Sequence, residues 1–249
     1  MTAPRPLSDA PSIGTYAYEP NPRGNDVNIQ SAPQVREYEA IADRIAADRP
    51  GSVLDWGCGW GFVSVLLRER GLSVESLDYR TDLEREGLVP LERFPEQPVY
   101  LTSEPVRLPY DDDRFDAVLS LGVLEHVQDP RASLAELHRV LKPGGTLYVY
   151  KLPNRSSYLE WVARRAGMYY HGKYEHDTIY TLRSARRIVD EAGFTVGELR
   201  YANMLPLTVT GSAADRLAGP IWGANRALGR VPGLRGLATN VELVATARR

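Results

Sequence analysis

The chain has 249 residues, of which 43% are hydrophobic and 25% are charged, and its formal net charge is -2. This composition is typical of a folded globular protein and excludes a chain that is disordered throughout. The slightly acidic balance argues against a dedicated nucleic-acid-binding protein, which normally has a clear basic excess. The single cysteine, Cys58, excludes an internal disulfide and a metal site built from cysteines, and we expect no metal.

The first 30 residues are rich in Pro, Gly, Asn and Asp, and they predict an irregular N-terminal arm. This segment lacks the basic-then-apolar pattern of a signal peptide. The sequence also has no run of about 18 apolar residues, the length that a membrane-spanning helix needs. We therefore expect a cytoplasmic protein with one domain over residues 31–249.

The first half of the chain alternates between strand and helix signals. Apolar residues at helical spacing predict a helix after residue 31, which Pro50 and Gly51 end. "SVLDW" predicts a short buried strand, and a glycine-rich turn and a helix closed by Gly71 follow it. The segments 73–79 and 99–101 predict two further strands, and residues 80–98 read as irregular.

The second half continues the alternation and then changes character. Residues 114–122 and 146–152 predict strands on either side of a helix that starts at Asp129 and stops at Pro143-Gly144. A further helix starts at Thr181, and the alternating segments 195–202 and 240–247 predict an antiparallel pair at a sheet edge. The pattern predicts a doubly wound, mostly parallel seven-stranded α/β sheet with helices on both faces and an antiparallel C-terminal edge strand.

The turn after the first strand has glycines at 57, 59 and 61, which remove side chains where a ligand approaches the backbone. In an open α/β sheet, ligands bind at this end of the strands. Nicotinamide and flavin enzymes have G-x-G-x-x-G, whereas here Phe62 stands where the later glycine would fall. A dinucleotide-dependent oxidoreductase therefore remains an alternative, but the turn matches it poorly.

Two acids near this turn favour a ligand without phosphate. Asp55 would repel a pyrophosphate at the helix N-terminus, but it suits an ammonium group. Asp78 ends the second strand, where a carboxylate can hold a ribose diol. Both features suit S-adenosylmethionine, although Asp55 can also simply cap the turn and Asp78 simply end a strand.

Four stretches, "VLDWGCGWG", "VESLDY", "RLPYDDDRFDAVLSLGVLEHVQDP" and "LKPGGTLYV", resemble the successive motifs of class I S-adenosylmethionine-dependent methyltransferases. The resemblance covers about residues 34–202 and is nearest to the small-molecule, methyltransferase type 11-like branch, with a Rossmann-like fold. It implies in-line methyl transfer to a small acceptor, which could be aromatic, lipid-linked or sugar-like, on O, N or C. A module that binds the cofactor without turnover remains a second alternative. The implied cofactor-binding residues are Asp55, Gly57, Cys58, Gly59, Asp78, Tyr79, Glu104, Pro105, Val106, Ser120 and Leu121.

Two histidines are candidates for a general base, which methyl transfer requires only for a hydroxyl or a protonated amine. His126 follows the fourth strand on the ligand side of the sheet, and His176 lies between Glu175 and Asp177. Structural roles for both remain open. We expect acceptor or lid insertions at about 153–180 and 205–238.

The C-terminal region is rich in arginine, with 7 arginines from Arg200 onward against two acids, Asp215 and Glu242. Residues 214–237 combine these arginines with apolar residues, so they could contact an anionic membrane as a peripheral segment. A lid helix packed on the core is the alternative. Nothing in the sequence defines an oligomeric state.

Overall fold

A computed structural model describes residues 31–59, 61–79, 99–167, 177–207 and 216–249. The predicted arm over 1–30 and the candidate base His176 lie outside these ranges. The chain divides into two compact units, which we describe separately. Unit 1 is Met1–Ser103 with Leu207–Trp222, and unit 2 is Glu104–Pro206 with Gly223–Arg249. One domain over residues 31–249 stays a prediction.

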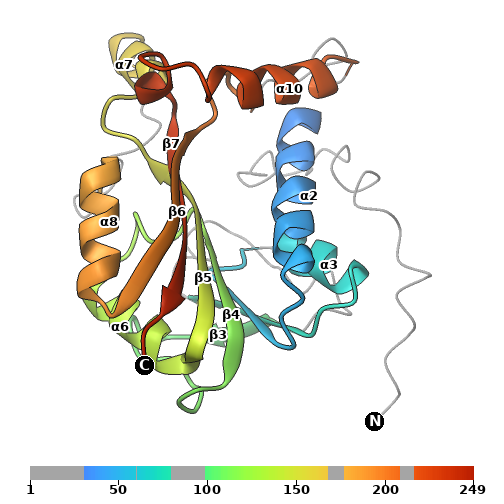
Figure 1. The fold of residues 1–249 in the computed structure, drawn as a ribbon, viewed down its shortest axis with the longest axis vertical. Helices are drawn as coiled ribbons and strands as arrows, with labels where there is room; N and C mark the ends of the chain where they lie inside the picture. Colours follow the sequence, from blue (N-terminus) through green and yellow to red (C-terminus); the bar gives the residue numbers. More distant parts are fainter. Residues whose placement is uncertain (1–30, 60, 80–98, 168–176, 208–215) are drawn as a thin grey trace. The chain divides into compact units, whose positions relative to one another are not determined.

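The described residues of unit 1 form three parallel strands and two complete helices. The strands β1 (Val53–Trp56), β2 (Val74–Tyr79) and β3 (Val99–Thr102) pair in the order β1-β2-β3. The helices α2 (Ala32–Ala47) and α3 (Phe62–Glu69) lie side by side in Figure 1. Ser31 caps α2 by accepting a hydrogen bond from the Gln34 N–H, and Gly71, at φ 80°, follows the end of α3.

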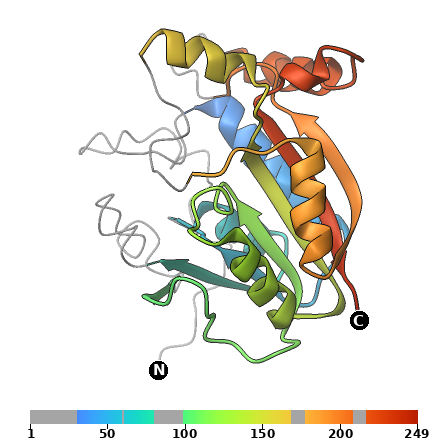
Figure 2. The same cartoon turned by 90° about the vertical axis from the view of Figure 1, so that its left-hand side faces the viewer.

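Unit 2 contains four strands and two helices that cover one sheet face. The strands are β4 (Phe115–Leu121), β5 (Leu141–Pro153), β6 (Phe194–Ala202) and β7 (Asn240–Ala247). β4 and β5 are parallel, whereas β7 runs antiparallel to both β5 and β6. Figures 1 and 2 show α6 (Pro130–Val140) and α8 (Leu182–Glu191) on the same face of this sheet.

Three further described helical elements lie in the segments that connect the strands. α7 (Tyr158–Arg165) begins shortly after β5, and the 3-10 helix η2 (Arg235–Leu237) precedes β7. Helix α10 (Ala218–Leu228) ends in unit 2. Within the described ranges, no helix is long and apolar enough to cross a membrane.

The seven strands follow the order β3-β2-β1-β4-β5-β7-β6. The predicted mostly parallel, seven-stranded Rossmann-like sheet is therefore confirmed. The predicted pairing of 195–202 with 240–247 is confirmed as well. The C-terminal strand β7 is antiparallel, and it lies between β5 and β6, so that β6 forms the edge next to it.

Helices α6 and α8 begin at the predicted N-cap residues, but α6 ends earlier than the sequence predicts. Asp129 accepts hydrogen bonds from the N–H groups of Arg131 and Ala132, and Thr181 forms a reciprocal capping box with Ser184. The helix expected to reach Pro143 ends at Val140. Leu141 is already extended and pairs with Phe115, and Lys142, which directly precedes Pro143, is the residue in which the proline disfavours the helical conformation.

Candidate functional site

The glycine turn of unit 1 has a backbone that only glycine adopts readily. Gly57, Gly59 and Gly61 have φ angles of 73°, 54° and 77°, all in the left-handed region. The N–H groups of Gly57 and Cys58 both donate to the carbonyl of Leu77, at 2.8 and 3.1 Å. The turn is therefore fastened to β2 and presents bare backbone at the end of β1.

Asp78 links this turn to the end of β2. Its carboxylate accepts hydrogen bonds from the backbone N–H of Gly59 and, at 2.6 Å, from that of Tyr79. Asp78 is 8% exposed, so these bonds hold an ionised group that is largely removed from water. Side-chain-free backbone beside a fixed carboxylate is a donor and acceptor set that fits the sugar and methionine parts of S-adenosylmethionine.

Asp55 is anchored inside unit 1. It is 2% exposed and accepts a hydrogen bond from Ser64 Oγ at 2.5 Å, and Ser64 in turn accepts one from Ser76 Oγ at 2.6 Å. Burial raises the pKa of Asp55 to about 6, although the Ser64 hydroxyl acts against the increase. This network gives Asp55 a structural partner, and its contact with the ammonium group of a cofactor stays a prediction.

Cys58 lies within the turn, and its thiol stays protonated. Burial raises the pKa of Cys58, and the carboxylates of Asp55 and Asp78 raise it further. A neutral thiol is a weak nucleophile and behaves as a small apolar group. Cys58 therefore suits a role in packing or in lining the turn.

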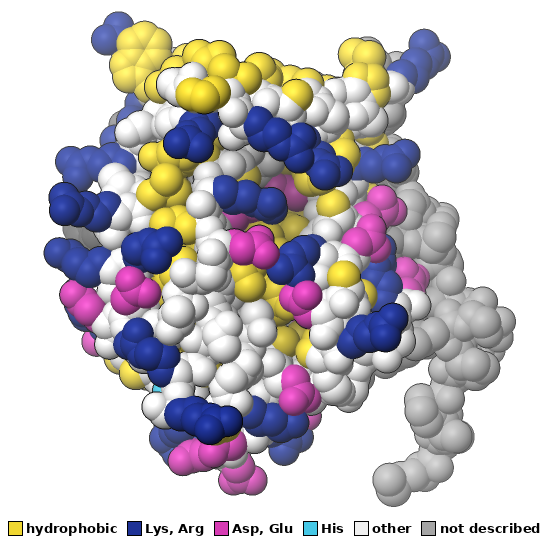
Figure 3. Space-filling view, in the orientation of Figure 1, with side chains coloured by type: hydrophobic (Ala, Val, Ile, Leu, Met, Phe, Trp, Pro, Cys, Tyr) yellow, Lys and Arg dark blue, Asp and Glu magenta, His cyan; other side chains and the backbone are white. Residues whose placement is uncertain are grey.

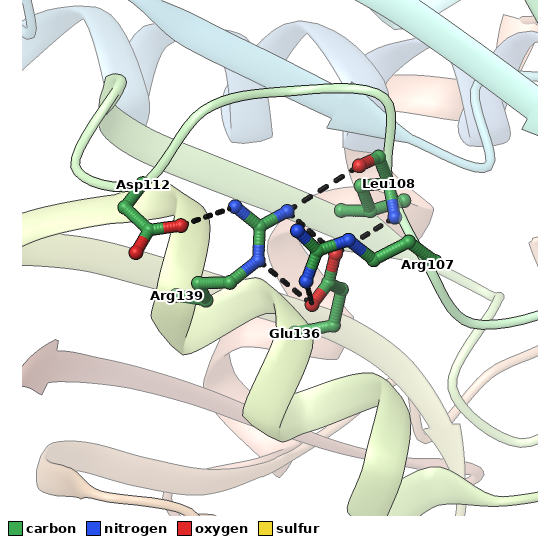
Figure 4. Close-up of polar contacts among 5 residues, drawn as sticks. All are labelled: Arg107, Leu108, Asp112, Glu136 and Arg139. Carbon is green, nitrogen blue, oxygen red and sulfur yellow. Dashed lines mark hydrogen bonds and ion pairs between the residues drawn. The ribbon is translucent and has the colours of Figure 1, made fainter.

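In unit 2, the segment that carries Glu104, Pro105 and Val106 is braced by Glu136 of α6. Glu136 accepts the Leu108 N–H at 2.8 Å and pairs with Arg139 through both carboxylate oxygens, at 2.6 and 2.9 Å (Figure 4). Arg139 also bonds to Asp112 at 2.6 Å and to the Leu108 carbonyl at 3.3 Å. The position of this segment therefore depends on one buried acid.

The proposed cofactor contacts of unit 2 differ in exposure. Glu104 and Pro105 are exposed, whereas Val106 and Leu121 are half-buried. Ser120, at the end of β4, is fully buried, and its Oγ has no hydrogen-bond partner among the described residues. Buried hydroxyls normally have a partner, so Ser120 is the member of this group with a hydrogen bond left to make. Cofactor contacts of all these residues stay predictions.

His126 and Asp177 form an imidazole–carboxylate pair in unit 2. His126 Nδ1 lies 2.9 Å from Asp177 Oδ1, and its Nε2 lies 3.9 Å from Glu125 Oε1. The side chain of His126 is 41% exposed, whereas those of Asp177 and Glu125 are each 3% exposed. The imidazole therefore faces outward while two acids hold it from the inside.

Glu125 is the more unusual of the two acids. Its Oε2 has no hydrogen-bond partner in the described part of the chain. Burial raises the pKa of Glu125 to about 7; the charge of His126 lowers it and that of Asp177 raises it. The carboxyl group therefore changes charge near neutral pH, which is frequent among residues at functional sites.

The sequence pointed to Asp177 as a neighbour of His176, but the structure pairs Asp177 with His126. Two backbone-directed bonds bring the segments together: Thr178 N–H donates to the Glu125 carbonyl at 2.8 Å, and Tyr180 Oη donates to the Leu124 carbonyl at 3.2 Å. The partners lie 51 positions apart, so no local pattern indicated the pair. Among the described residues, no group of three His, Cys, Asp or Glu side chains is placed to hold a metal ion.

The strand order and the glycine turn are those of the Rossmann-like methyltransferase fold. The family described as "Methyltransferase domain" matches residues 30–199. The chain belongs to this methyltransferase family, and it is a methyltransferase. The family relationship does not favour the dinucleotide-dependent oxidoreductase considered above.

Similar proteins agree with this assignment. An uncharacterized methyltransferase of Mycobacterium tuberculosis is 29% identical over 184 residues, which cover 68% of this chain and 91% of that protein. A demethylmenaquinone methyltransferase of Renibacterium salmoninarum is 31% identical over 144 residues, 55% of this chain and 59% of that protein. The fold is also that of Burkholderia thailandensis 1,6-didemethyltoxoflavin-N1-methyltransferase, whose crystal structure contains bound 1,6-didemethyltoxoflavin and S-adenosylhomocysteine. The TM-score is 0.56 at 19% identity, over 91% and 83% of the two chains.

Proposed function

We propose that this methyltransferase uses S-adenosylmethionine and methylates a hydroxyl or protonated amine of a small molecule, with His126 as the general base. The observation that carries the proposal is the 2.9 Å contact between His126 Nδ1 and Asp177 Oδ1. When bound, the cofactor supplies a methyl group that is already activated on a sulfonium. The protein's remaining tasks are to hold the ligands in line and to remove a proton.

Unit 1 supports the binding of the cofactor. Gly57 and Gly59 offer backbone without side chains, and Asp78 offers a fixed carboxylate to the ribose hydroxyls. Tyr79, directly after Asp78, is half-buried and is proposed to pack on the adenine. Cys58 and Asp55 remain in the proposed set as residues that shape the turn.

His126 is the group with the right surroundings to move a proton. Asp177 accepts a hydrogen bond from Nδ1–H, which fixes the tautomer and leaves the lone pair on Nε2. Once Nε2 has taken a proton, the carboxylate of Asp177 stabilises the imidazolium. Glu125, 3.9 Å from Nε2, adds to this stabilisation when it is ionised.

The acceptor class follows from this base. A carbon or thiolate acceptor does not need a positioned imidazole, whereas a phenol, an alcohol or an ammonium group must lose a proton. The names of two similar proteins contain demethylmenaquinone and 1,6-didemethyltoxoflavin, which are ring compounds, so these names support a ring-containing acceptor, whereas the O–H or N–H is argued from His126 alone. We therefore propose a small, flat, ring-containing acceptor with an ionisable O–H or N–H.

The test measures cofactor binding and turnover separately. Calorimetry with S-adenosylhomocysteine measures binding, and release of S-adenosylhomocysteine is followed with a panel of phenols, hydroquinones and aryl amines. His126→Ala should lower kcat by at least 100-fold with any substrate found and leave the calorimetric Kd unchanged. His138→Ala is the matched control, because His138 packs edge-on against Phe194 at 5.1 Å and should affect stability alone. Unchanged turnover in His126→Ala would refute the base.

We also propose the cytoplasmic location that the sequence predicts, and the single cysteine is compatible with a reducing compartment. Fractionation of cells that express the full chain tests it, and recovery from a periplasmic fraction would contradict it.

A further inference from the structure

Unit 2 has an exposed apolar surface whose residues are not among the proposed cofactor contacts or the proposed base. We name it the α7–η2 surface, after the two elements that build it. Its apolar members are all solvent-exposed, between 39% and 58%: Trp161, Val162, Val231, Leu234 and Leu237. A contiguous group of exposed large apolar side chains marks an interaction site, whereas single exposed apolar side chains are common on protein surfaces.

Two clamps hold the parts of this surface together although they are far apart in the sequence. Asn154, just before α7, donates through Nδ2 to the carbonyls of Gly236 and Ala238, at 2.9 and 2.7 Å. The backbone at 204–205 forms the second clamp: the Met204 carbonyl accepts a bond from Tyr158 Oη at 2.7 Å, and Leu205 N–H donates to Asn225 Oδ1 at 2.6 Å. Side-chain hydrogen bonds within unit 2 therefore fix the segments that carry this surface.

The charges around the apolar residues have one sign. Residues 161–167 and 223–239 contain arginines and no Asp or Glu. The segments that carry or adjoin the apolar residues have these exposed arginines: Arg155, Arg164, Arg165, Arg226, Arg230 and Arg235. Figure 3, in the orientation of Figure 1, shows hydrophobic side chains next to Lys or Arg side chains at the place where Figure 1 labels α7. The nearest acid in sequence, Glu160, has a side chain that is 12% exposed, and Arg164 pairs with it.

Trp161 gives the surface the chemistry of a lipid interface. The Arg165 guanidinium lies over the indole ring, 4.3 Å from its centroid, so an aromatic ring and a cation are presented together. Tryptophan and arginine are the residues that favour the headgroup layer of a bilayer, since each combines an apolar body with a polar end.

We propose that the α7–η2 surface is a peripheral docking site for an anionic lipid membrane. The apolar side chains enter the headgroup boundary, and the exposed arginines contact the acidic headgroups. Charge complementarity selects this occupant: a second copy of the chain would set arginines against arginines, without acids between them in these segments. The site extends the sequence prediction for 214–237 to α7, and it does not depend on which acceptor is methylated.

The experiment is co-flotation of the full chain with vesicles of phosphatidylglycerol and phosphatidylcholine, compared with vesicles of phosphatidylcholine alone. We expect binding to the first kind only, weakening as salt is raised. Arg230→Glu with Arg235→Glu should lower the vesicle affinity by more than about 25-fold, since each arginine near an anionic surface contributes roughly fivefold. Trp161→Ser with Leu234→Ser should also abolish flotation.

The matched controls lie elsewhere on the chain. Arg183→Glu with Arg186→Glu removes two exposed arginines of α8, and Tyr100→Ser removes a tyrosine that is 52% exposed on β3. Both should float like the wild type. Equal flotation of all variants, no flotation of the wild type, or a wild-type dimer in light scattering that Trp161→Ser dissociates would each overturn the proposal. Circular dichroism checks that every variant folds.

Discussion

His126 Nδ1 lies 2.9 Å from Asp177 Oδ1, and the two residues are brought together across 51 positions of chain. We expect Asp177→Asn to lower kcat between about tenfold and 10⁴-fold, because an amide neither fixes the tautomer reliably nor stabilises an imidazolium. The Kd for S-adenosylhomocysteine should not change. The ¹⁵N shifts of His126 report the tautomer directly, and an unchanged tautomer with unchanged kcat would show that the pair is structural.

Asp78→Ala should weaken the binding of S-adenosylhomocysteine at least tenfold. The substitution removes the proposed ribose acceptor and also the carboxylate that accepts the Gly59 N–H. Calorimetry measures the change, and circular dichroism checks the fold. Asp43→Asn is the control, since Asp43 is an acid of unit 1 whose side chain is 68% exposed and paired with Arg70. Equal affinity of wild type and Asp78→Ala would remove Asp78 from the site.

Glu125 should make the protein less stable as the pH rises through neutrality. Burial raises its pKa from 4.5 to about 7, so the folded state binds its proton more tightly than the unfolded state does. The stability that this proton contributes is present below about pH 4.5 and is lost as the pH rises through 7, by about 3 kcal/mol. Glu125→Gln should flatten this slope in urea unfolding between pH 5 and 8.5. An unchanged slope would contradict the raised pKa.

Glu136 should show the opposite pH dependence. Burial alone would raise its pKa, but the hydrogen bonds from Arg139 and Leu108 outweigh this and lower it. Its stabilisation is therefore present above the ordinary carboxyl pKa and is lost as the pH falls through the lowered value. Glu136→Ala should cost about 3–5 kcal/mol in urea unfolding at pH 7, because it leaves Arg139 and the Leu108 N–H without this partner. A cost below about 1 kcal/mol would mean that the brace is dispensable.

Asn154→Ala should destabilise unit 2 by about 2–4 kcal/mol and loosen residues 235–238. The change leaves the carbonyls of Gly236 and Ala238 without their donor. Urea unfolding measures the stability, and hydrogen exchange at residues 235–239 measures the loosening. Ser156→Ala, an exposed neighbour, is the control. Protection at 235–239 equal to that of the wild type would show that Asn154 is not the clamp.

Local signals predicted the elements of this fold well. Asp129 and Thr181 cap their helices as expected, because a side-chain oxygen that satisfies the first N–H groups acts within three residues. The glycines at 57, 59 and 61 have the positive φ angles that a tight strand-to-helix turn requires. These features depend on neighbours in sequence, so one sequence is enough to find them.

The pairings that build the candidate site and the α7–η2 surface could not be predicted in the same way. His126 meets Asp177, and Asn154 meets Gly236, only after distant segments pack. Helix α7 was missed as well: Ala163 is its one buried residue and Trp161 and Val162 are exposed, so the helix has no apolar face packed on the core that a periodic pattern could reveal. The backbone of Lys151, at φ 65° in β5, gives no sequence signal, since lysine rarely adopts it.

The position of β7 between β5 and β6 sets a limit on how unit 2 can fold. The pair Thr146–Thr246 joins residues 100 positions apart (246 minus 146), and β6 has β7 as its described strand neighbour. β6 and α8 therefore have no sheet to join until residues 240–247 have been synthesised. Such late, non-local pairing slows folding and exposes strand edges in the meantime. We expect substitutions within β7 to lower the yield of folded protein more strongly than substitutions of equal burial in β4.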